Sequence, residues 1–485
     1  MRIIEKSSRL LPWLSLSTIF ILGLLCFSGP AYAEDERSQS SLKEESLGAS
    51  IDYAKESKAI SYDAERPEDL LSLRYGGKFN ISYKYYKNID NEKNTEDFLK
   101  WTLAEDLFVW ADLNYAKTHR VYAKIYDSYI TRKTGETYTG IGADNGGPWL
   151  SLGFYELNLS ELGVPLRLTT GRQYFFLGTG VAYSAVHDGI QAEIFQKPFY
   201  FKTFAAKTQP RQDNIDFSVP GFEKEGDRVF AGTELSYLGF SNTSLYGFGL
   251  IQKDNSSSNP DTPSQIYHYN SRYAGAGIAS SPVKGLDTWA EFIYEGGAGF
   301  TDASRTALAK THVKAYAYQL GAKFSPDLPT NPAIRSSYAY GSGDEDRTSV
   351  TNTVGGDLDG HDKNFLYFGY YQTGYALQPR LSNLKLWEID GSFSPLESVP
   401  LFKKMALGAK YYIYWKDKTN GGTSDFQSTS DDGAIGNEWN LFMSWRIFQD
   451  VTLDLKYGVF SPGEAFPEDS RANTHFFSST VALTF

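Results

Sequence analysis

After its first 33 residues, the sequence has no cysteine and no apolar segment long enough for a membrane helix. Its only cysteine is Cys26, so the rest of the chain can form no disulfide. A membrane helix needs roughly 20 consecutive apolar residues, and no later segment approaches that length. Catalytic signatures such as GxSxG, HExxH and GxxxxGKS/T are missing, and the six histidines are scattered. We therefore expect no enzyme, no metal site, no cofactor and, with a formal net charge of −11, no nucleic-acid partner.

The N-terminal residues 1–33 predict a secretory signal peptide. A basic start is followed by an apolar core over residues 10–28 and by Ala31-Tyr32-Ala33, which is a small-residue cleavage site. A lipoprotein signal that uses Cys26 is the alternative, but leucines stand before it where small residues are required. Residues 34–69 are rich in Ser, Glu and Lys and acidic overall, so we expect a flexible periplasmic segment there.

From residue 70 to residue 485 the sequence contains short strand-like segments whose connections alternate between long and short. The long connections are 87–100, 133–149, 175–188, 209–225, 254–264, 297–311, 343–382, 418–435 and 461–473. The short ones include 117–118, 161–164, 239–241, 281–284 and 448–450. Outer-membrane barrels have short periplasmic turns and long outer loops. The pattern predicts an all-β fold, a transmembrane antiparallel β-barrel of about 18 strands; a soluble sandwich or propeller is the alternative, although no blade repeat is visible.

Individual segments support a barrel with one wet and one lipid-facing surface. In residues 73–86 the odd positions are apolar or aromatic and the even positions are polar, and residues 406–416 and 451–460 alternate in the same way. The chain ends on an amphipathic strand that closes with Phe485, similar to the assembly signal of outer-membrane proteins. We therefore expect an outer-membrane location, contact with the lipid bilayer and lipopolysaccharide, and recognition of Phe485 by the outer-membrane assembly machinery.

The strand phase also places charged side chains inside the barrel. The candidate pore-lining bases are Arg74, Lys78, Arg120, Lys124, Arg167, Arg172, Arg228, Arg272, Arg335, Lys410, Arg446 and Lys456, and the candidate acids are Glu156, Asp188 and Glu438. Bases that line a narrow, low-dielectric tube concentrate anions and repel cations. The sequence therefore predicts an anion-preferring pore. The alternative is that these charges pair across strands and only hold the lumen together.

The connection 343–382 differs from the others. It begins with acidic, Gly-rich sequence and continues into the aromatic stretch 365–375. A connection of this length usually folds into the pore or caps it. Asp357, Asp359 and Asp362 could ligate calcium, but their spacing departs from an EF-hand loop, so no metal site is predicted.

Four separated motifs resemble the alginate-export outer-membrane porin family. They are Leu168–Gln173 with Asp188-Gly189, Leu381–Leu384, Gly436–Leu441 and Tyr457–Phe466. The resemblance implies a monomeric eighteen-stranded barrel that exports an acidic polysaccharide through an arginine-lined pore. The chain departs from the family pattern in its mixed lumen charge and in the very short turn 448–450, where the alginate exporter has a longer periplasmic plug.

Three functional hypotheses follow. The first is a passive channel for an anionic polysaccharide or oligosaccharide, which is an alginate-export-like porin. The second is a general or small-anion diffusion porin. The third is a barrel without a channel, used in adhesion or as an anchor. The composition leaves the substrate and its direction of travel open.

Overall fold

The computed structural model describes residues 70–485, apart from 93–96, 98, 134–140, 146, 211–214, 216–225, 257–267, 301–308, 348–349, 351–354, 357–359 and 426. The predicted signal peptide, residues 1–33, and the predicted acidic segment, residues 34–69, lie outside the described residues. Among the described residues, no helix has the length and apolar character needed to cross a membrane.

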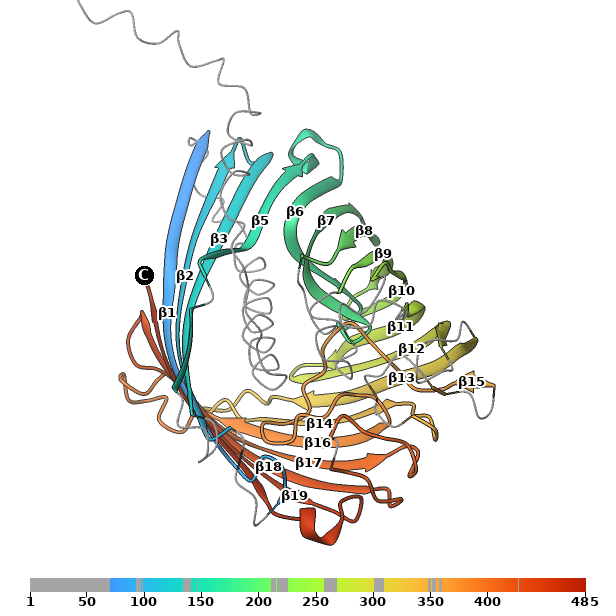
Figure 1. Ribbon diagram of the computed structural model, residues 1–485. Coiled ribbons are helices and arrows are strands. Elements are labelled where there is room, and N and C mark those ends of the chain that lie inside the picture. Colours follow the sequence, from blue (N-terminus) through green and yellow to red (C-terminus); the bar gives the residue numbers. More distant parts are fainter. Residues whose placement is uncertain are drawn as a thin grey trace, which may run out of the picture. The chain divides into compact units, whose positions relative to one another are not determined.

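The described strands pair into one antiparallel sheet that closes on itself as an 18-stranded β-barrel (Figure 1). The first barrel strand pairs with the second and also with the last, which closes the ring. The strands are β1 (Leu71–Lys87), β2 (Trp101–Tyr115), β3 (His119–Lys133), β4 (Ile141–Asn145), β5 (Trp149–Asn158), β6 (Leu166–Leu177), β7 (Tyr183–Gln196), β8 (Phe199–Lys207), β9 (Arg228–Phe240), β10 (Thr243–Asp254), β11 (Asn270–Val283), β12 (Leu286–Phe300), β13 (Lys310–Phe324), β14 (Ala333–Gly341), β15 (His361–Asp362), β16 (Leu384–Phe393), β17 (Met405–Lys416), β18 (Ala434–Arg446), β19 (Val451–Pro462) and β20 (Thr474–Thr484).

Two of these strands supplement the barrel. The five-residue β4 pairs with the outer end of β3, beyond the part of β3 that pairs with β5. The two-residue β15 lies parallel to β13 at His312 and Val313, which β14 does not reach. The remaining strands make the barrel, so the predicted fold class and strand number are confirmed.

With one exception, the predicted long connections are long and lie at one rim; the other rim has short turns, apart from the 11-residue connection 394–404. Turns such as 116–118, 197–198, 241–242 and 284–285 lie at one rim, together with the start of β1 and the end of β20. The longest connection, 342–383, leaves the opposite rim.

The exception is the connection between β6 and β7, which is only 178–182 rather than the predicted 175–188. Both strands continue past the point where β5 and β8 stop pairing with them, at Arg172 and Asp188. The segment that was predicted to be a loop is therefore a β-hairpin whose backbone groups bond to each other.

Side chains alternate between the two faces of the wall. On β1, Tyr75, Ile81, Tyr83 and Tyr85 are exposed on the outer face, whereas Asn80 and Ser82 between them are buried on the inner face. Neighbouring residues of a strand point to opposite sides, so the outer face is apolar and the inner face polar. This confirms the predicted phase of the first strand.

The last residue extends the pairing of β1 with β20 that closes the barrel. The Phe485 carbonyl accepts a hydrogen bond from the Gly77 N–H at 2.7 Å, and the Phe485 N–H donates to the Gly77 carbonyl at 3.0 Å. A Cβ at Gly77 would lie 2.4 Å from the Phe485 ring, so only glycine admits this ring against β1.

Candidate functional site

The connection 342–383 folds into the barrel and crosses its interior. The carboxylate of Glu438 attaches it to β18. Glu438 accepts hydrogen bonds from the backbone N–H groups of Tyr375 at 2.5 Å, of Ala376 at 2.9 Å and of Leu377 at 2.9 Å. The hydroxyl of Tyr414 on β17 donates to the Thr373 carbonyl at 2.7 Å. These bonds satisfy loop backbone groups that would otherwise be buried without a partner.

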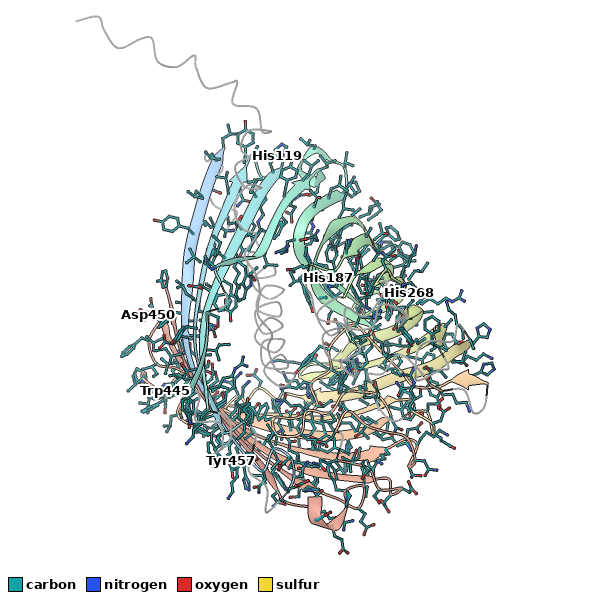
Figure 2. The ribbon with its side chains drawn as sticks, in the orientation of Figure 1. His119, His187, His268, Trp445, Asp450 and Tyr457 are labelled. Carbon is teal, nitrogen blue, oxygen red and sulfur yellow. The ribbon has the colours of Figure 1, made fainter. Side chains whose placement is uncertain are left out.

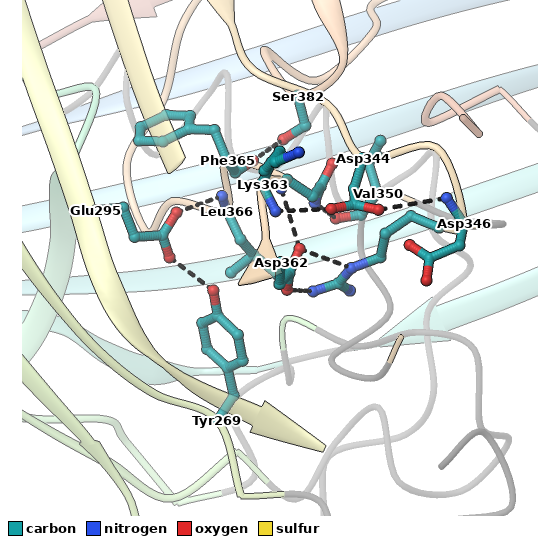
Figure 3. Close-up of polar contacts among 12 residues, drawn as sticks. Tyr269, Glu295, Asp344, Asp346, Val350, Asp362, Lys363, Phe365, Leu366 and Ser382 are labelled. Atoms are coloured by element: carbon teal, nitrogen blue, oxygen red, sulfur yellow. Dashed lines mark hydrogen bonds and ion pairs between the residues drawn. The ribbon is translucent and has the colours of Figure 1, made fainter. Parts of the chain in front are cut away.

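A second carboxylate, on β12, holds the same connection to another part of the wall (Figure 3). Glu295 on β12 accepts the Leu366 N–H at 2.8 Å and the Tyr269 hydroxyl at 2.7 Å. The Tyr273 hydroxyl donates to Glu295 at 3.0 Å and lies 2.6 Å from the Leu366 carbonyl. Two inward glutamates on distant strands therefore fix the two halves of the loop.

The outer part of the loop is held by its own charges. Arg347 and Asp362 form a fully buried ion pair, and Asp344 accepts the Lys363 N–H at 2.8 Å. Burial, together with the neighbouring Asp346, raises the pKa of Asp344 to about 6. Of the possible calcium ligands, Asp357 and Asp359 lie outside the described residues, whereas the Asp362 carboxylate is occupied by Arg347. No group of three metal-ligating side chains lies together in the described part of the chain.

The β6–β7 hairpin also turns into the lumen. At its tip, Gly178 donates its N–H to Glu234 of β9 at 2.9 Å, and Thr179 donates its N–H to Glu291 of β12 at 2.8 Å. His187 points into the interior (Figure 2), stacks on Phe230 and bonds to the hydroxyl of Tyr183. The tip therefore contacts β9 and β12, although β6 and β7 are paired in the wall with β5 and β8. The hairpin must bend inward to reach them.

Glycines permit this bend. Gly171 has a φ of 121°, and a Cβ there would lie 2.3 Å from the Gly153 carbonyl oxygen. Gly189, opposite Gly171 on β7, would place a Cβ 2.2 Å from the Ala205 carbonyl oxygen. Any other residue would clash at both positions, which are the last two before the hairpin leaves the wall.

The hairpin and the loop meet each other inside the barrel. The Phe368 N–H donates to the Ala182 carbonyl at 3.1 Å, and the Tyr370 N–H donates to the Gly180 carbonyl at 3.1 Å. We call residues 178–182 together with 342–383 the inner partition. We call the inward faces of β9–β18, which hold the partition by hydrogen bonds, the covered wall; Tyr375 of the partition also lies 6.4 Å from the Phe476 ring of β20.

On the covered wall three of the predicted bases, Arg228, Arg335 and Lys410, lie beside acids. Arg228 pairs with Asp254 at 2.9 Å. Arg335 pairs with Glu388 at 2.6 Å and with Asp390 at 2.7 Å, and Lys410 lies 3.6 Å from Glu388. Here the interpretation of lumen charges as structural pairs agrees with the contacts.

The inward faces of β19, β20, β1 and β2, where the barrel closes, differ in chemistry. We call them the seam wall. Lys78 lies on the same face as Asn80 and Ser82, and Ser82 shares a hydrogen bond of 2.9 Å with Thr480. Lys456 lies opposite Ser478, and its ammonium is 5.3 Å from the centre of the Tyr375 ring. Within the described residues, neither Lys78 nor Lys456 has a carboxylate partner.

The remaining predicted residues of the first strands lie inside the barrel near the rim of short turns or along β3. Arg74 and Arg120 both bind Asp112, at 2.6 Å and 2.9 Å. Glu156 lies opposite Arg120. The Lys124 ammonium lies 4.8 Å from the centre of the Phe108 ring, within a stacked group of aromatic side chains on β2, β3 and β5.

Arg167 pairs with Glu193 at 2.7 Å on the inner face. Arg446 donates to the Gln449 carbonyl and so closes the turn after β18. Neither guanidinium stands free in the lumen.

Two predictions about the lumen are not supported. Arg172 and Asp188, expected to line the pore, pair with each other at 2.8 Å at the bend of the hairpin, on the strand face opposite to the inward Gln173 and His187. Arg272 is on the outer face, opposite the exposed Ile251, because its neighbour Tyr273 points inward. The small residues on both faces of β11 give no clear alternation, and a tyrosine can face either side.

The interior also contains functional residues that the sequence analysis missed. The inserted hairpin tip at Gly178 and Thr179 was placed in an outer loop, and Glu193 and Tyr269 were not singled out. The available signal was the set of glycines at 171, 178, 180 and 189, which marks both the bend and the tip of the hairpin.

Solved structures with the same fold are outer-membrane porins. The chain is similar to Pseudomonas aeruginosa OccK5 (OpdH), with a TM-score of 0.51, 11% identity and coverage of 85% of this chain and 98% of that chain. It is also similar to Pseudomonas aeruginosa OccK8 (OprE), with a TM-score of 0.51, 9% identity and coverage of 85% and 98%. Acinetobacter baumannii OccAB1 matches with a TM-score of 0.50, 11% identity and coverage of 85% and 96%. These likenesses show the fold alone.

Barrel closure, the apolar outer face and the polar interior define an outer-membrane channel. The sequence profile described as alginate export matches residues 73–479, so the chain belongs to the alginate export family. Its family and fold are those of transport porins, and its location is the bacterial outer membrane, in contact with lipid and lipopolysaccharide. A search of curated protein sequences finds no match.

Proposed function

We propose that the protein is a passive channel for an anionic polysaccharide or oligosaccharide, which moves along the seam wall. The observation that carries the proposal is the contrast in charge pairing inside the barrel. Three inward bases of the covered wall, Arg228, Arg335 and Lys410, lie beside acids, whereas Lys78 and Lys456 on the seam wall have no carboxylate partner among the described residues. Membership of the alginate export family supports an acidic glycan as the cargo.

The chemistry of the seam wall fits a sugar acid. Unpaired ammonium groups attract carboxylates at contact distance, and the hydroxyls of Ser82, Thr480 and Ser478 can exchange hydrogen bonds with sugar hydroxyls. The carboxylate of Asp454 lies on the same face, two residues from Lys456, and limits how tightly an anion is held. A mixed wall of this kind favours passage over tight binding.

The proposal contains no catalytic step. It assigns to the protein a single barrel that acts as a monomer, and it assigns the final strand with Phe485 to recognition by the outer-membrane assembly machinery. The two hydrogen bonds between Phe485 and Gly77 support the latter role, because they extend the β1–β20 pairing that closes the barrel.

A general or small-anion diffusion porin is the second candidate. The inner partition favours it, because a crossing structure held by Glu295 and Glu438 restricts the width available to a polymer. The two candidates make the same prediction for ion selectivity and different predictions for block by a glycan.

The test is reversal potential in planar bilayers under a potassium chloride gradient, followed by addition of a linear oligouronate or a neutral oligosaccharide of equal length. We expect anion selectivity in the wild type, block by the oligouronate alone, and weaker selectivity in the Lys78→Gln/Lys456→Gln variant. Lys133→Gln, an outer-face lysine at the end of β3, is the matched control. Cation selectivity of the wild type contradicts both candidates; anion selectivity without block supports the small-anion porin.

A further inference from the structure

The outer face of the barrel carries exposed cations near the long-loop ends of β10, β11 and β13. They are Lys253, Arg272 and Lys314. Strand register places them together: Arg272 lies beside Gly296 of β12, and Gly296 lies beside Lys314. Lys253 is two residues beyond Ile251, the residue opposite Arg272. Diagonal neighbours of this kind are about 7–8 Å apart.

These cations have no carboxylate partner in the described part of the chain. The nearby acids Asp254 of β10 and Glu295 of the intervening β12 point inward and are occupied by Arg228 and by the inner partition. The Lys314 ammonium lies 2.9 Å from Nε2 of His361, a second basic side chain. The cluster is therefore a patch of uncompensated positive charge on the outside of the barrel.

The outer face next to the patch, on the side toward the membrane centre, is apolar. Ile251 is 65% exposed on β10, Tyr294 is 44% exposed on β12, and Tyr316 is 41% exposed on β13. Tyr294 and Tyr316 are register partners and lie two residues closer to the short-turn rim than Gly296 and Lys314. Exposed apolar and aromatic side chains on a barrel face lie against acyl chains. The cations therefore lie at the polar edge of the outer leaflet.

We propose that this patch binds a phosphate group of an outer-leaflet glycolipid, with Arg272 and Lys314 as its two principal ligands. A Cβ at Gly296 would lie 3.7 Å from Cγ and 3.8 Å from Nε of Arg272, so the Arg272 side chain extends over this glycine, which lies between Arg272 and Lys314. Adjacent strands are about 4.8 Å apart, so Arg272 and Lys314 start about 10 Å apart and both long side chains reach a group between them. The Arg272 guanidinium can hold two phosphate oxygens at once, and Lys314 and Lys253 add point charges.

The occupant is a lipid rather than a soluble phosphate. The apolar surface of Ile251, Tyr294 and Tyr316 continues from the cations toward the membrane centre, so a ligand with both a phosphate and acyl chains makes both contacts at once. The patch faces away from the lumen, so this site is independent of the proposed transport function.

The experiment measures binding of bis-phosphorylated lipid A to the purified full-length barrel in detergent, by native mass spectrometry and by thermal shift. We expect at least a tenfold loss of lipid A affinity in the Lys253→Gln/Arg272→Gln/Lys314→Gln variant. Lys87→Gln/Lys133→Gln is the matched control, because it removes exposed outer-face lysines at the outer ends of β1 and β3. It should bind as the wild type does.

Dephosphorylated lipid A and inorganic phosphate separate the contributions of the two parts of the ligand. The proposal requires weaker binding of dephosphorylated lipid A to the wild type and no competition by millimolar phosphate. Equal affinity of the triple variant and the wild type for lipid A overturns it, as does equal binding of both lipids to the wild type. The channel selectivity of the triple variant should stay unchanged, so the outcome is separable from that of the transport tests.

Discussion

The covered wall and the seam wall belong to one sheet but differ in how their inward charged side chains are paired. On the covered wall, Glu295 and Glu438 receive backbone N–H groups of the inserted loop, and bases such as Arg335 are bound to acids. On the seam wall, Lys78 and Lys456 have no carboxylate partner among the described residues, and small hydroxyl side chains lie between them. A protein surface that must hold a loop satisfies its charges internally, whereas a surface that must attract a solute keeps them available.

The same residue types therefore have different roles on the two walls. Lys410 and Lys78 are both inward lysines of the barrel, but Lys410 is 3.6 Å from Glu388, whereas Lys78 forms no ion pair within the described residues. Knowing only that both side chains point inward does not distinguish the role of Lys410 from that of Lys78. The difference arises from which acids the neighbouring strands and the inner partition bring close.

Removing most of the connection 342–383 should remove the difference between the covered wall and the seam wall. Gly341 and Leu384 are register partners, so two glycines in place of residues 344–381 can join β14 to β16. We expect the shortened barrel to insert normally and its single-channel conductance to rise by about twofold or more, because an 18-stranded barrel has an aqueous lumen. Single-channel recording in planar bilayers measures this; an unchanged conductance would show that the loop does not restrict the pore.

Glu438→Ala should release one half of the loop. Three N–H groups lose their acceptor, and each unsatisfied group costs about 1–3 kcal/mol, so loop docking should weaken by at least about 3 kcal/mol. We expect noisier, higher conductance and faster proteolysis within residues 342–383. Glu438→Gln keeps an acceptor oxygen and should lie between wild type and Ala. Proteolysis of both variants at the wild-type rate contradicts the anchoring role.

Two lysine variants compare the walls directly. Lys78→Gln should lower the anion preference by roughly twofold to fivefold, since a unit charge at contact in water contributes about 1 kcal/mol. Lys410→Gln should leave selectivity nearly unchanged and lower the free energy of unfolding by about 1 kcal/mol. Reversal potentials and urea unfolding in lipid vesicles measure the two effects, and the opposite assignment would reverse our description of the walls.

The smallest effect concerns pH. Burial raises the pKa of Asp344 from 3.8 to about 6 in the docked loop, so the docked state binds a proton more tightly than a released loop. Loop docking is then strongest at low pH and weakens as pH rises from about 4 to about 6. We expect the open-channel conductance to increase over this range and Asp344→Asn to flatten the increase. A conductance that falls with rising pH would contradict the sign of the effect.

The barrel could be predicted from the sequence because its signals are local. The alternation in residues 73–86 and the regular spacing of long and short connections depend only on which face of each strand meets lipid. Where those signals were weak, the prediction was wrong. Arg272 was assigned to the lumen because β11 has small residues on both faces, and the tyrosine beside it points inward to reach Glu295.

The sequence by itself determined the closed barrel, the phase of its clearest strands, and a longest connection that folds into the pore or caps it. Only the tertiary structure decided that residues 172–188 form an inserted hairpin, that Arg172 is neutralised by Asp188, and that Glu438 binds backbone groups rather than solute. The physical reason is that lipid acts on every strand independently, and so leaves a repeating pattern in the sequence. Charge pairing and loop docking depend on residues tens to hundreds of positions apart, which only the closed ring brings together.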